Sequence, residues 1–327
     1  MPRAEISTAQ HIDHRPAEDA FRHEALLYAG MDGFLEGTVP FLRDAAEAGE
    51  PTLVVVSSGK IARLRAELGV TADEVIFADM GEVGTNPARI IPAWQAFVDR
   101  FADAGRPVRG IGEPIWAERS ADELVECQRH EALLNLAFAD AADFWLLCPY
   151  DTEALDDAVI ETAHHSHPAV VDDGCWRESA SYVDLEAVAA PFADPLPPAP
   201  RDAHELAFTD ATLAAVRGFA AFHAAEAGLD ELRAGDLVLA INEVATNSVR
   251  HGGGHGVVRL WGDAEAVICE VVDAGGVAAP LAGRERPRDG QMGGHGLWLV
   301  NQVCDLVQVR AFAGAGVVRM RMNMSQA

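Results

Sequence analysis

The sequence predicts an α/β protein of two units: a doubly wound, mostly parallel sheet, followed by a smaller α+β sandwich with helices on one face of a mixed sheet. Three observations predict this fold class. Strand-like and helix-like stretches alternate from residue 21 to about residue 174, as in sheets wound by crossover helices. Five prolines then interrupt the pattern within residues 191–200 (PFADPLPPAP). After them the chain predicts helices and hairpins instead of further alternation.

Four apolar runs rich in β-branched or aromatic residues predict the strands of the first unit. They are residues 52–57 (TLVVVS), 74–78 (EVIFA), 108–112 (VRGIG) and 143–148 (DFWLLC). Helical stretches over 61–68, 88–102 and 121–139 lie between them. We expect this unit to span residues 20–180, between a polar, disordered tail over 1–19 and a semi-rigid proline-rich linker over 190–202.

The second unit, expected over residues 203–327, begins with two predicted helices, 211–226 and 234–251. A hairpin (257–261 and 266–272), a helix (297–304) and a second hairpin (306–312 and 317–322) are predicted to follow. In the last strand Val318, Met320 and Met322 alternate with Arg319 and Arg321. This alternation predicts one buried face and one wet face.

Composition excludes several classes of function. The 327 residues carry a formal net charge of −26, which repels nucleic-acid phosphates and anionic membrane surfaces, so we expect neither partner. The five cysteines are an odd number and form no CxxC pair, which argues against a disulfide framework or a thiolate zinc site. We find no secretory-type apolar segment near residue 1 and no run of membrane-spanning length, and therefore expect a cytoplasmic protein.

The helix predicted over 234–251 carries the first candidate site residues. Glu243, Asn247 and His251 recur at every fourth position and therefore share one helix face. The amide oxygen of Asn247 is a hard ligand suited to Mg²⁺, and the Glu243 carboxylate can accept a proton from an attacking hydroxyl. For this segment alone, a solvated helix face is an equal alternative.

Two glycine-rich segments supply further candidates. Asp273 ends an apolar strand before Gly275 and Gly276, so its carboxylate can accept a hydrogen bond from an adenine amino group that the glycines let approach. The run Gly293–Leu297 (GGHGL) opens a helix, which frees backbone N–H groups for phosphate oxygens. Taken singly, an ordinary strand-ending turn and a flexible helix lead-in explain these segments equally well.

The order of the three segments resembles that of the GHKL, or Bergerat-fold, ATPases. NEVATNSVRHGGG and GGHGLWLVNQVCD are similar to the N-box and the second glycine box of the anti-sigma-factor serine/threonine kinases, and the likeness covers residues 205–322. It implies ATP and Mg²⁺ as cofactors, with Asn247 on the metal and Glu243 activating the substrate hydroxyl. The implied nucleotide-contacting residues are Asn247, His251, Asp273, Gly275, Gly294, Gly296 and Leu297.

The resemblance implies a transcription regulator that sequesters a sigma factor and phosphorylates a STAS-type anti-sigma antagonist, in a family whose members commonly form homodimers. The sequence departs from the pattern of this family at three positions. Val277 replaces a glycine, His295 stands where arginine is frequent, and Gly316 occupies a region where threonine often contacts adenine. A non-catalytic, ATP-dependent protein-binding module therefore remains an alternative. A sensor histidine kinase is another, although His223 lacks the expected acidic and basic residues after it.

The first unit resembles the MEDS sensory domain, whose sheet is RecA/KaiC-like. The likeness rests on FRHEALLYAG, GEPTLVVVSS, GEPIW at 112–116 and FWLLCPYD. Ser57–Lys60 does not form a GxxxxGK[ST] phosphate loop. Five residues near strand ends either bind a small-molecule ligand or a partner, or serve in packing and turns: His23, Tyr28, Glu113, Trp116 and Tyr150.

Three histidines crowd one short stretch: His164, His165 and His167. Metal binding is one interpretation of such a group. No cysteine or carboxylate at ligand spacing accompanies them, so we favour a solvated loop.

Overall fold

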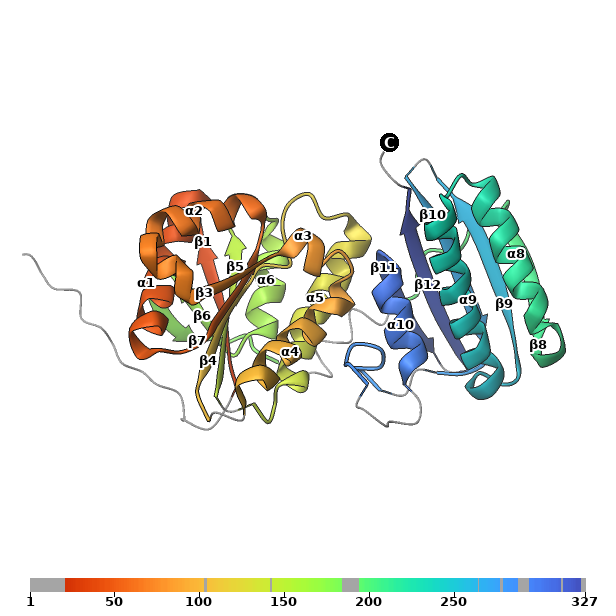
Figure 1. Cartoon of the computed structure of the whole chain (residues 1–327). Coiled ribbons are helices and arrows are strands. Elements are labelled where there is room, and N and C mark those ends of the chain that lie inside the picture. Colours follow the sequence, from red (N-terminus) through yellow and green to blue (C-terminus); the bar gives the residue numbers. More distant parts are fainter. Residues whose placement is uncertain are drawn as a thin grey trace, which may run out of the picture.

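The computed structural model describes residues 21–102, 105–141, 143–183, 194–263, 265–276, 279–287, 294–312 and 314–324. These residues form two domains, each built on its own β-sheet (Figure 1). The tail predicted over residues 1–19 lies outside the described residues. Within the described ranges, no helix is both long enough and apolar enough to cross a bilayer.

The first domain contains a seven-stranded sheet in the order β3-β2-β4-β5-β1-β6-β7. All its strand pairs are parallel except the pair of β6 with β7. The strands are β1 Arg22–Tyr28, β2 Thr52–Val56, β3 Val75–Asp79, β4 Val108–Gly112, β5 Phe144–Asp151, β6 Ala169–Asp172 and β7 Cys175–Glu178. The helices are α1 Gly30–Ala48, α2 Ser58–Leu68, α3 Met80–Val83, α4 Ile90–Ala102, α5 Ala121–Ala137 and α6 Asp157–Ser166. The predicted doubly wound, mostly parallel sheet is confirmed.

Helices cover both faces of this sheet, which makes the central strands continuously apolar. The helices α1 and α2 pack on one face through Phe34 and Leu64, whereas α4, α5 and α6 pack on the other (Figure 1). Trp94 of α4 lies directly over β4. A Cβ at Gly110 or Gly112 would stand only 2.8 or 2.9 Å from its ring, so these glycines make room for the largest buried side chain of the domain.

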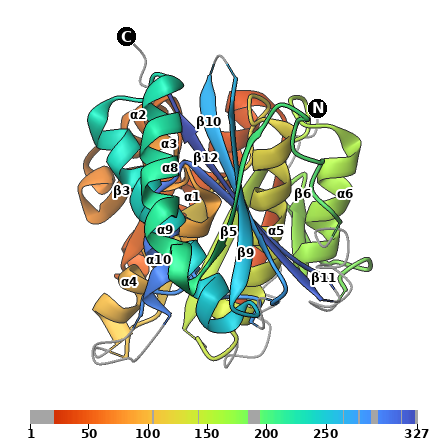
Figure 2. The same ribbon diagram turned by 90° about the vertical axis from the view of Figure 1, so that its right-hand side faces the viewer.

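The second domain contains a five-stranded sheet in the order β11-β12-β10-β9-β8. Its strands are β8 His204–Thr209, β9 His255–Gly262, β10 Ala266–Asp273, β11 Leu306–Phe312 and β12 Ala315–Asn323. Three helices pack on one face of it (Figure 2): α8 Leu213–Glu226, α9 Glu231–His251 and α10 His295–Val303. The α+β sandwich is confirmed, but the expected mixed sheet is wrong, since every described pair is antiparallel. Strand β12 lies between β10 and β11, so the strands joined through α10 are not neighbours.

The face of this sheet opposite the helices is covered in part by the proline-rich segment. Arg319 pairs with Glu270 at 2.6 Å and donates a hydrogen bond to the carbonyl of Pro197 at 2.5 Å. Arg319 is only 9% exposed, so the prediction that its face of β12 is wet is wrong. A segment that cannot form strand or helix covers the polar face instead.

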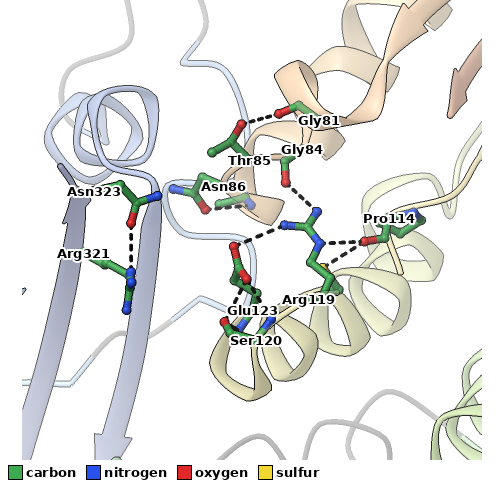
Figure 3. Close-up of polar contacts among 12 residues, drawn as sticks. Gly81, Gly84, Thr85, Asn86, Pro114, Arg119, Ser120, Glu123, Arg321 and Asn323 are labelled. Carbon is green, nitrogen blue, oxygen red and sulfur yellow. Dashed lines mark hydrogen bonds and ion pairs between the residues drawn. The ribbon is translucent and has the colours of Figure 1, made fainter. Parts of the chain in front are cut away.

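The edge strand β11 faces the first domain (Figure 1). Arg129 of α5 donates to the carbonyl of Val309 at 3.0 Å, which satisfies a group that an edge strand leaves unpaired. Asn86 donates to the carbonyl and side-chain oxygens of Asn301 at 3.1 and 3.2 Å. Figure 3 shows how Arg119 fixes the loop that ends at Asn86, by donating to the carbonyls of Gly84 and Pro114.

Candidate functional site

The helix α9 presents Glu243 and Asn247 one turn apart, beside the start of α10. Asp230 caps α9 by accepting from the N–H of Arg233 at 2.9 Å, and the helix buries Leu237, Ile241 and other apolar residues against the sheet. Both polar side chains are half-buried. A Cβ at Gly296 would lie 3.0 Å from Glu243 Oε2 and 3.2 Å from Asn247 Nδ2. The structure therefore brings these three predicted site residues together.

The first turn of α10 is built to leave backbone donors free. Gly294 precedes the helix with φ of 83°, a left-handed conformation that glycine adopts without strain, and no side chain caps the helix. The N–H groups of this turn have no intrahelical acceptor. Leu297 packs on the core of the second domain and holds the turn in place. Gly293, the first residue of the predicted run, lies outside the described residues.

A second group forms around Asp273 at the end of β10. Asp273 Oδ1 accepts from the N–H of Gly275 at 2.8 Å. A Cβ at Gly252 would lie 2.5 Å from Oδ2 of Asp273, and one at Gly316 would lie 3.0 Å from Oδ1. Three glycines from three segments thus surround the carboxylate, and any side chain at these positions would fill the space beside it. The side chain of His251 is exposed, while its carbonyl lies 3.0 Å from a Cβ at Gly275.

Sequence reasoning missed the roles of Gly252 and Gly316 in this group. Gly252 opens a run of three glycines directly after α9. Gly316 was noted only because a threonine is absent nearby. Gly316 is the second residue of β12 and lies opposite Asp273; a glycine at the start of a strand is the signal that could have identified it, since strand glycines often mark a close approach.

The donor groups of this site fit a magnesium-bound nucleotide. A half-buried carboxylate and amide offer oxygen ligands of the type that Mg²⁺ prefers. The uncapped helix start offers N–H groups for anionic oxygens. The glycine-lined space beside Asp273 is a cradle that a Cβ would fill.

The loop between β10 and α10 is anchored in the first domain through its described part, residues 279–287. Leu281 packs against the hydrophobic core of the first domain. The carbonyl of Gly283 accepts from Asn301 at 2.8 Å. Arg284 donates to Glu126 of α5 at 2.6 Å. This loop, which precedes α10 in the chain, therefore depends on the first domain for its position.

Glu126 holds a buried cluster of charges between the domains. Its second oxygen accepts from Arg310 of β11 at 2.8 Å. The side chains of Glu126, Arg284 and Arg310 are at most 5% exposed. Burial lowers the pKa of the Arg284 guanidinium below its ordinary value. One carboxylate thus pairs with two buried cations from two segments of the second domain.

A cavity of about 1190 Å³ lies between α4, the end of α5 and this loop. Gln95, Phe138, Leu281, Glu285 and Gly294 are among the residues that line it. It borders the start of α10 at Gly294, but Glu243 and Asn247 are not part of its wall.

A second candidate site lies at the carboxyl ends of the parallel strands in the first domain. The Tyr28 hydroxyl, at the end of β1, donates to Glu113 Oε1 at 2.6 Å. Lys60, in the first turn of α2, places Nζ 2.5 Å from both oxygens. Burial raises the pKa of Glu113, and Lys60 opposes that shift. This edge is where doubly wound sheets bind ligands, and two of the five predicted sensory residues meet there.

The remaining candidates of the first domain lie elsewhere. Trp116 packs under the Arg119 guanidinium, 3.8 Å from its ring centroid. His23 and Tyr150 are buried and lie near His167, with ring centroids 4.0 and 5.6 Å from it. Burial lowers the pKa of His23 to about 4. The solvated-loop interpretation of the three-histidine stretch is wrong: His164 and His165 belong to α6, and His167 is fully buried.

Comparison with known proteins gives the class of each domain. Residues 22–168 match the model of the MEthanogen/methylotroph, DcmR Sensory domain, abbreviated MEDS. Residues 206–322 match the model of the histidine kinase-like ATPase domain. None of the curated proteins matches the chain.

One similar solved structure is that of the RsbU and RsbW domains of Rv1364c from Mycobacterium tuberculosis, at 23% identity and a TM-score of 0.28. The match covers 40% of this chain and only 34% of that one.

Fold and site together define a sensory domain joined to a GHKL-type ATPase domain. The chain thus combines a region that matches the MEDS domain with a region that matches the histidine kinase-like ATPase domain, as the resemblance predicted.

Proposed function

We propose that the second domain binds ATP with Mg²⁺, sequesters a sigma factor, and phosphorylates a serine or threonine of a STAS-type antagonist under the control of the first domain. The observation that carries this proposal is the convergence of Glu243, Asn247 and Gly296, with Gly296 close enough that a Cβ would touch both side chains. This arrangement supports the proposal because an amide oxygen suited to Mg²⁺, a carboxylate able to accept a proton and free N–H groups could then act on one nucleotide.

Each residue has a defined task in this proposal. Asn247 provides an amide oxygen to Mg²⁺, and Glu243 accepts the proton of the substrate hydroxyl. Asp273 accepts a hydrogen bond from the adenine amino group, with Gly275 allowing the base to approach. The turn at Gly294–Leu297 neutralises phosphate charge with backbone N–H groups. Bound ATP supplies the phosphoryl group, and positioning with charge neutralisation is the main requirement of such a transfer.

Calorimetry on the full chain with ATP and Mg²⁺ tests the nucleotide site. We expect Asn247→Ala to lose binding and Glu243→Gln to keep binding while losing phosphate transfer, because the first removes a metal ligand and the second only a proton acceptor. Asn242→Ala is the matched control, since Asn242 lies on the same helix and its oxygen accepts from Arg217 instead. Full-strength binding by Asn247→Ala would refute the site.

The anchored loop supports control by the first domain. Leu281 and Arg284 hold residues 279–287 against the core and α5 of the MEDS domain. A displacement of α5 would therefore move the segment that leads to the turn at Gly294. A ligand that favours one position of α5 would change nucleotide affinity by this route.

A non-catalytic module is the second candidate. Val277 stands where the first glycine box has glycine, and this change favours nucleotide-dependent partner binding without transfer. Incubation with radiolabelled ATP and proteins captured from the host separates the two candidates. A labelled serine or threonine on a captured antagonist supports the kinase, while nucleotide-dependent capture without label supports the module.

A further inference from the structure

Four buried side chains from distant segments of the first domain meet at one point. They are His23 of β1, Glu131 of α5, Cys148 of β5 and His167, which follows α6, and their candidate ligand atoms all lie within 4.8 Å of one another. Glu131 Oε2 lies 3.2 Å from His23 Nε2 and 3.3 Å from His167 Nε2. Cys148 Sγ lies 3.4 Å from His23 Nε2. Each of the four is at most 1% exposed.

The hydrogen bonds around the cluster fix the tautomer of His23. Asn135 donates through Nδ2 to the carbonyl of Ser166 at 2.7 Å, so its oxygen Oδ1 is the atom that faces the imidazole. That oxygen lies 3.1 Å from His23 Nδ1. Because an amide oxygen only accepts, Nδ1 must carry the proton. The lone pair of Nε2 then points toward Glu131 and Cys148.

His167 is fixed in the same way. Its Nδ1 lies 2.8 Å from the carbonyl oxygen of Ala163, and a carbonyl only accepts, so Nδ1 is the donor. Its Nε2 therefore also presents a lone pair to Glu131. Imidazoles that donate through one nitrogen to a fixed oxygen and leave the other nitrogen free are the common arrangement around metal ions.

The centre of the cluster is consequently a convergence of electron-pair donors. Two imidazole nitrogens, a carboxylate oxygen and a sulfur face one another, and within the described part of the chain no donor reaches Glu131 Oε1 or His167 Nε2. Such a buried set is costly unless a cation lies among its members. Either protons lie among these atoms, that of the Cys148 thiol or one shared between an imidazole and the carboxylate, or a metal ion does.

Distances and charge favour the metal ion. Bonds of about 2.0–2.3 Å in a tetrahedral zinc site place neighbouring ligand atoms roughly 3.3–3.7 Å apart. Three contacts of the cluster, at 3.2, 3.3 and 3.4 Å, lie close to that spacing, and all pairs of candidate ligand atoms lie within 4.8 Å. A divalent ion with one thiolate and one carboxylate is also neutral overall, which suits a site without solvent.

We propose that His23, Glu131, Cys148 and His167 form a four-ligand site for a divalent transition-metal ion, with Zn²⁺ as the ion that this donor set fits best. Thiolate and imidazole ligands select Zn²⁺ over Mg²⁺ or Ca²⁺. Four protein ligands close the coordination sphere, so the ion links β1, β5, α5 and the segment after α6 and has no open position for a substrate. This site is independent of the nucleotide site.

Metal analysis of the full chain tests the proposal. The chain, stripped with a chelator, incubated with Zn²⁺ and passed over a desalting column, is expected to retain about one zinc ion per chain. Cys148→Ser is expected to retain less than about a fifth of that. The control is Cys127→Ser, a thiol of the same domain that is equally buried and contacts the carbonyl of Pro114; it is expected to keep the ion.

Loading the unmodified chain with Co²⁺ gives a readout that needs no variant. We expect intense visible bands of tetrahedral cobalt and a thiolate charge-transfer band, the latter absent in Cys148→Ser. Failure of the unmodified chain to retain Zn²⁺, or a cobalt spectrum without the thiolate band, would overturn the proposal and leave a proton in the cluster. Retention of full zinc by Cys148→Ser would overturn it as well.

Discussion

Replacing Glu126 with glutamine tests whether the MEDS domain positions the loop of the ATPase domain. Glutamine keeps the size of the side chain but loses its charge and one of its two strong acceptor oxygens. Arg284 and Arg310, at most 5% exposed, would then share an uncharged partner inside the domain interface. Arg129 also lies 3.8 Å from Glu126 and adds to the repulsion.

The expected cost follows from the burial of these cations. Removing one partner of a buried ion pair destabilises by about 3–5 kcal/mol, because the other charge remains without solvent or counter-charge. The chain can avoid this cost by releasing residues 279–287, so that Arg284 becomes hydrated. We therefore expect the loop to open before either domain unfolds, since neither domain core contains Glu126.

Hydrogen exchange followed by mass spectrometry measures this release directly. An opening free energy lowered by about 3 kcal/mol raises the exchange rate of the loop about a hundredfold. The N–H of Arg284, which donates to the carbonyl of Leu281, lies in the informative peptide. Asp122→Asn is the matched control, because it makes the same charge change at an exposed position of α5.

Unchanged exchange across residues 279–287 in Glu126→Gln would refute the reasoning. So would an equal increase over the whole ATPase domain, because that pattern indicates global destabilisation. The expected pattern also predicts a changed affinity for ATP with Mg²⁺ in Glu126→Gln and an unchanged affinity in Asp122→Asn. If the loop is released and the affinity stays constant, the route from α5 to the nucleotide is wrong.

Three further predictions concern single positions. Gly296→Ala is expected to change the thermal stability of the free chain little, because the higher helix propensity of alanine offsets the crowding of its methyl group against Glu243 and Asn247. It should weaken Mg-ATP binding about tenfold in calorimetry, because its methyl group would crowd the carboxylate and amide of α9. Lys60→Met removes the ammonium that opposes the raised pKa of Glu113. In that variant the folded state favours the protonated form of Glu113. The melting temperature should therefore lie slightly below that of the unmodified chain near pH 5 and further below it near pH 8. Adding Glu113→Gln should abolish this dependence on pH. Alkylation of the native chain should modify Cys175 first, because the other four thiols are buried and burial raises the pKa of each, that of Cys127 to about 12.

Much of the fold is predictable because strong local patterns agree with the tertiary structure. The strands β4 and β11 have the predicted bounds, Val108–Gly112 and Leu306–Phe312. In contrast, the strand β1 was not predicted from its sequence RHEALLY. His23 and Glu24 of this strand are both buried. A buried strand can contain these polar side chains only because each has a partner that is distant in sequence, Glu131 for His23 and Trp176 for Glu24. The pattern of apolar residues cannot report such partners.

The site in the ATPase domain was predictable because its residues stand in three compact motifs. The contacts between the domains were not, since charged residues are generally assigned to the surface. Glu126 meets Arg284 and Arg310 across 158 and 184 positions of sequence. Nothing in the local sequence of α5 distinguishes Glu126 from the exposed acid at position 122. For the same reason the sequence does not predict the cluster at Glu131, whose candidate ligand atoms come from four separate segments.

Helix α5 connects the buried cluster at Glu131 with the ATPase domain. Glu131 and Glu126 lie five positions apart, about 7.5 Å along the axis and roughly 140° around it, so one side of the helix faces the buried histidines while another faces Arg284. The segment after Glu113 leads into the same helix, and its Pro114 carbonyl accepts from Arg119 and Cys127 at 3.1 and 3.3 Å.

We expect a change at the Glu131 cluster or near Glu113 to reach the loop through the position of α5. A ligand of the MEDS domain can alter the nucleotide site only to the extent that it binds two positions of this helix with different affinity. If a ligand binds at the Glu131 cluster or near Glu113, Glu126→Gln should reduce the effect of that ligand on ATP affinity. Both places reach the loop through α5, and the substitution removes the charged contact between α5 and Arg284.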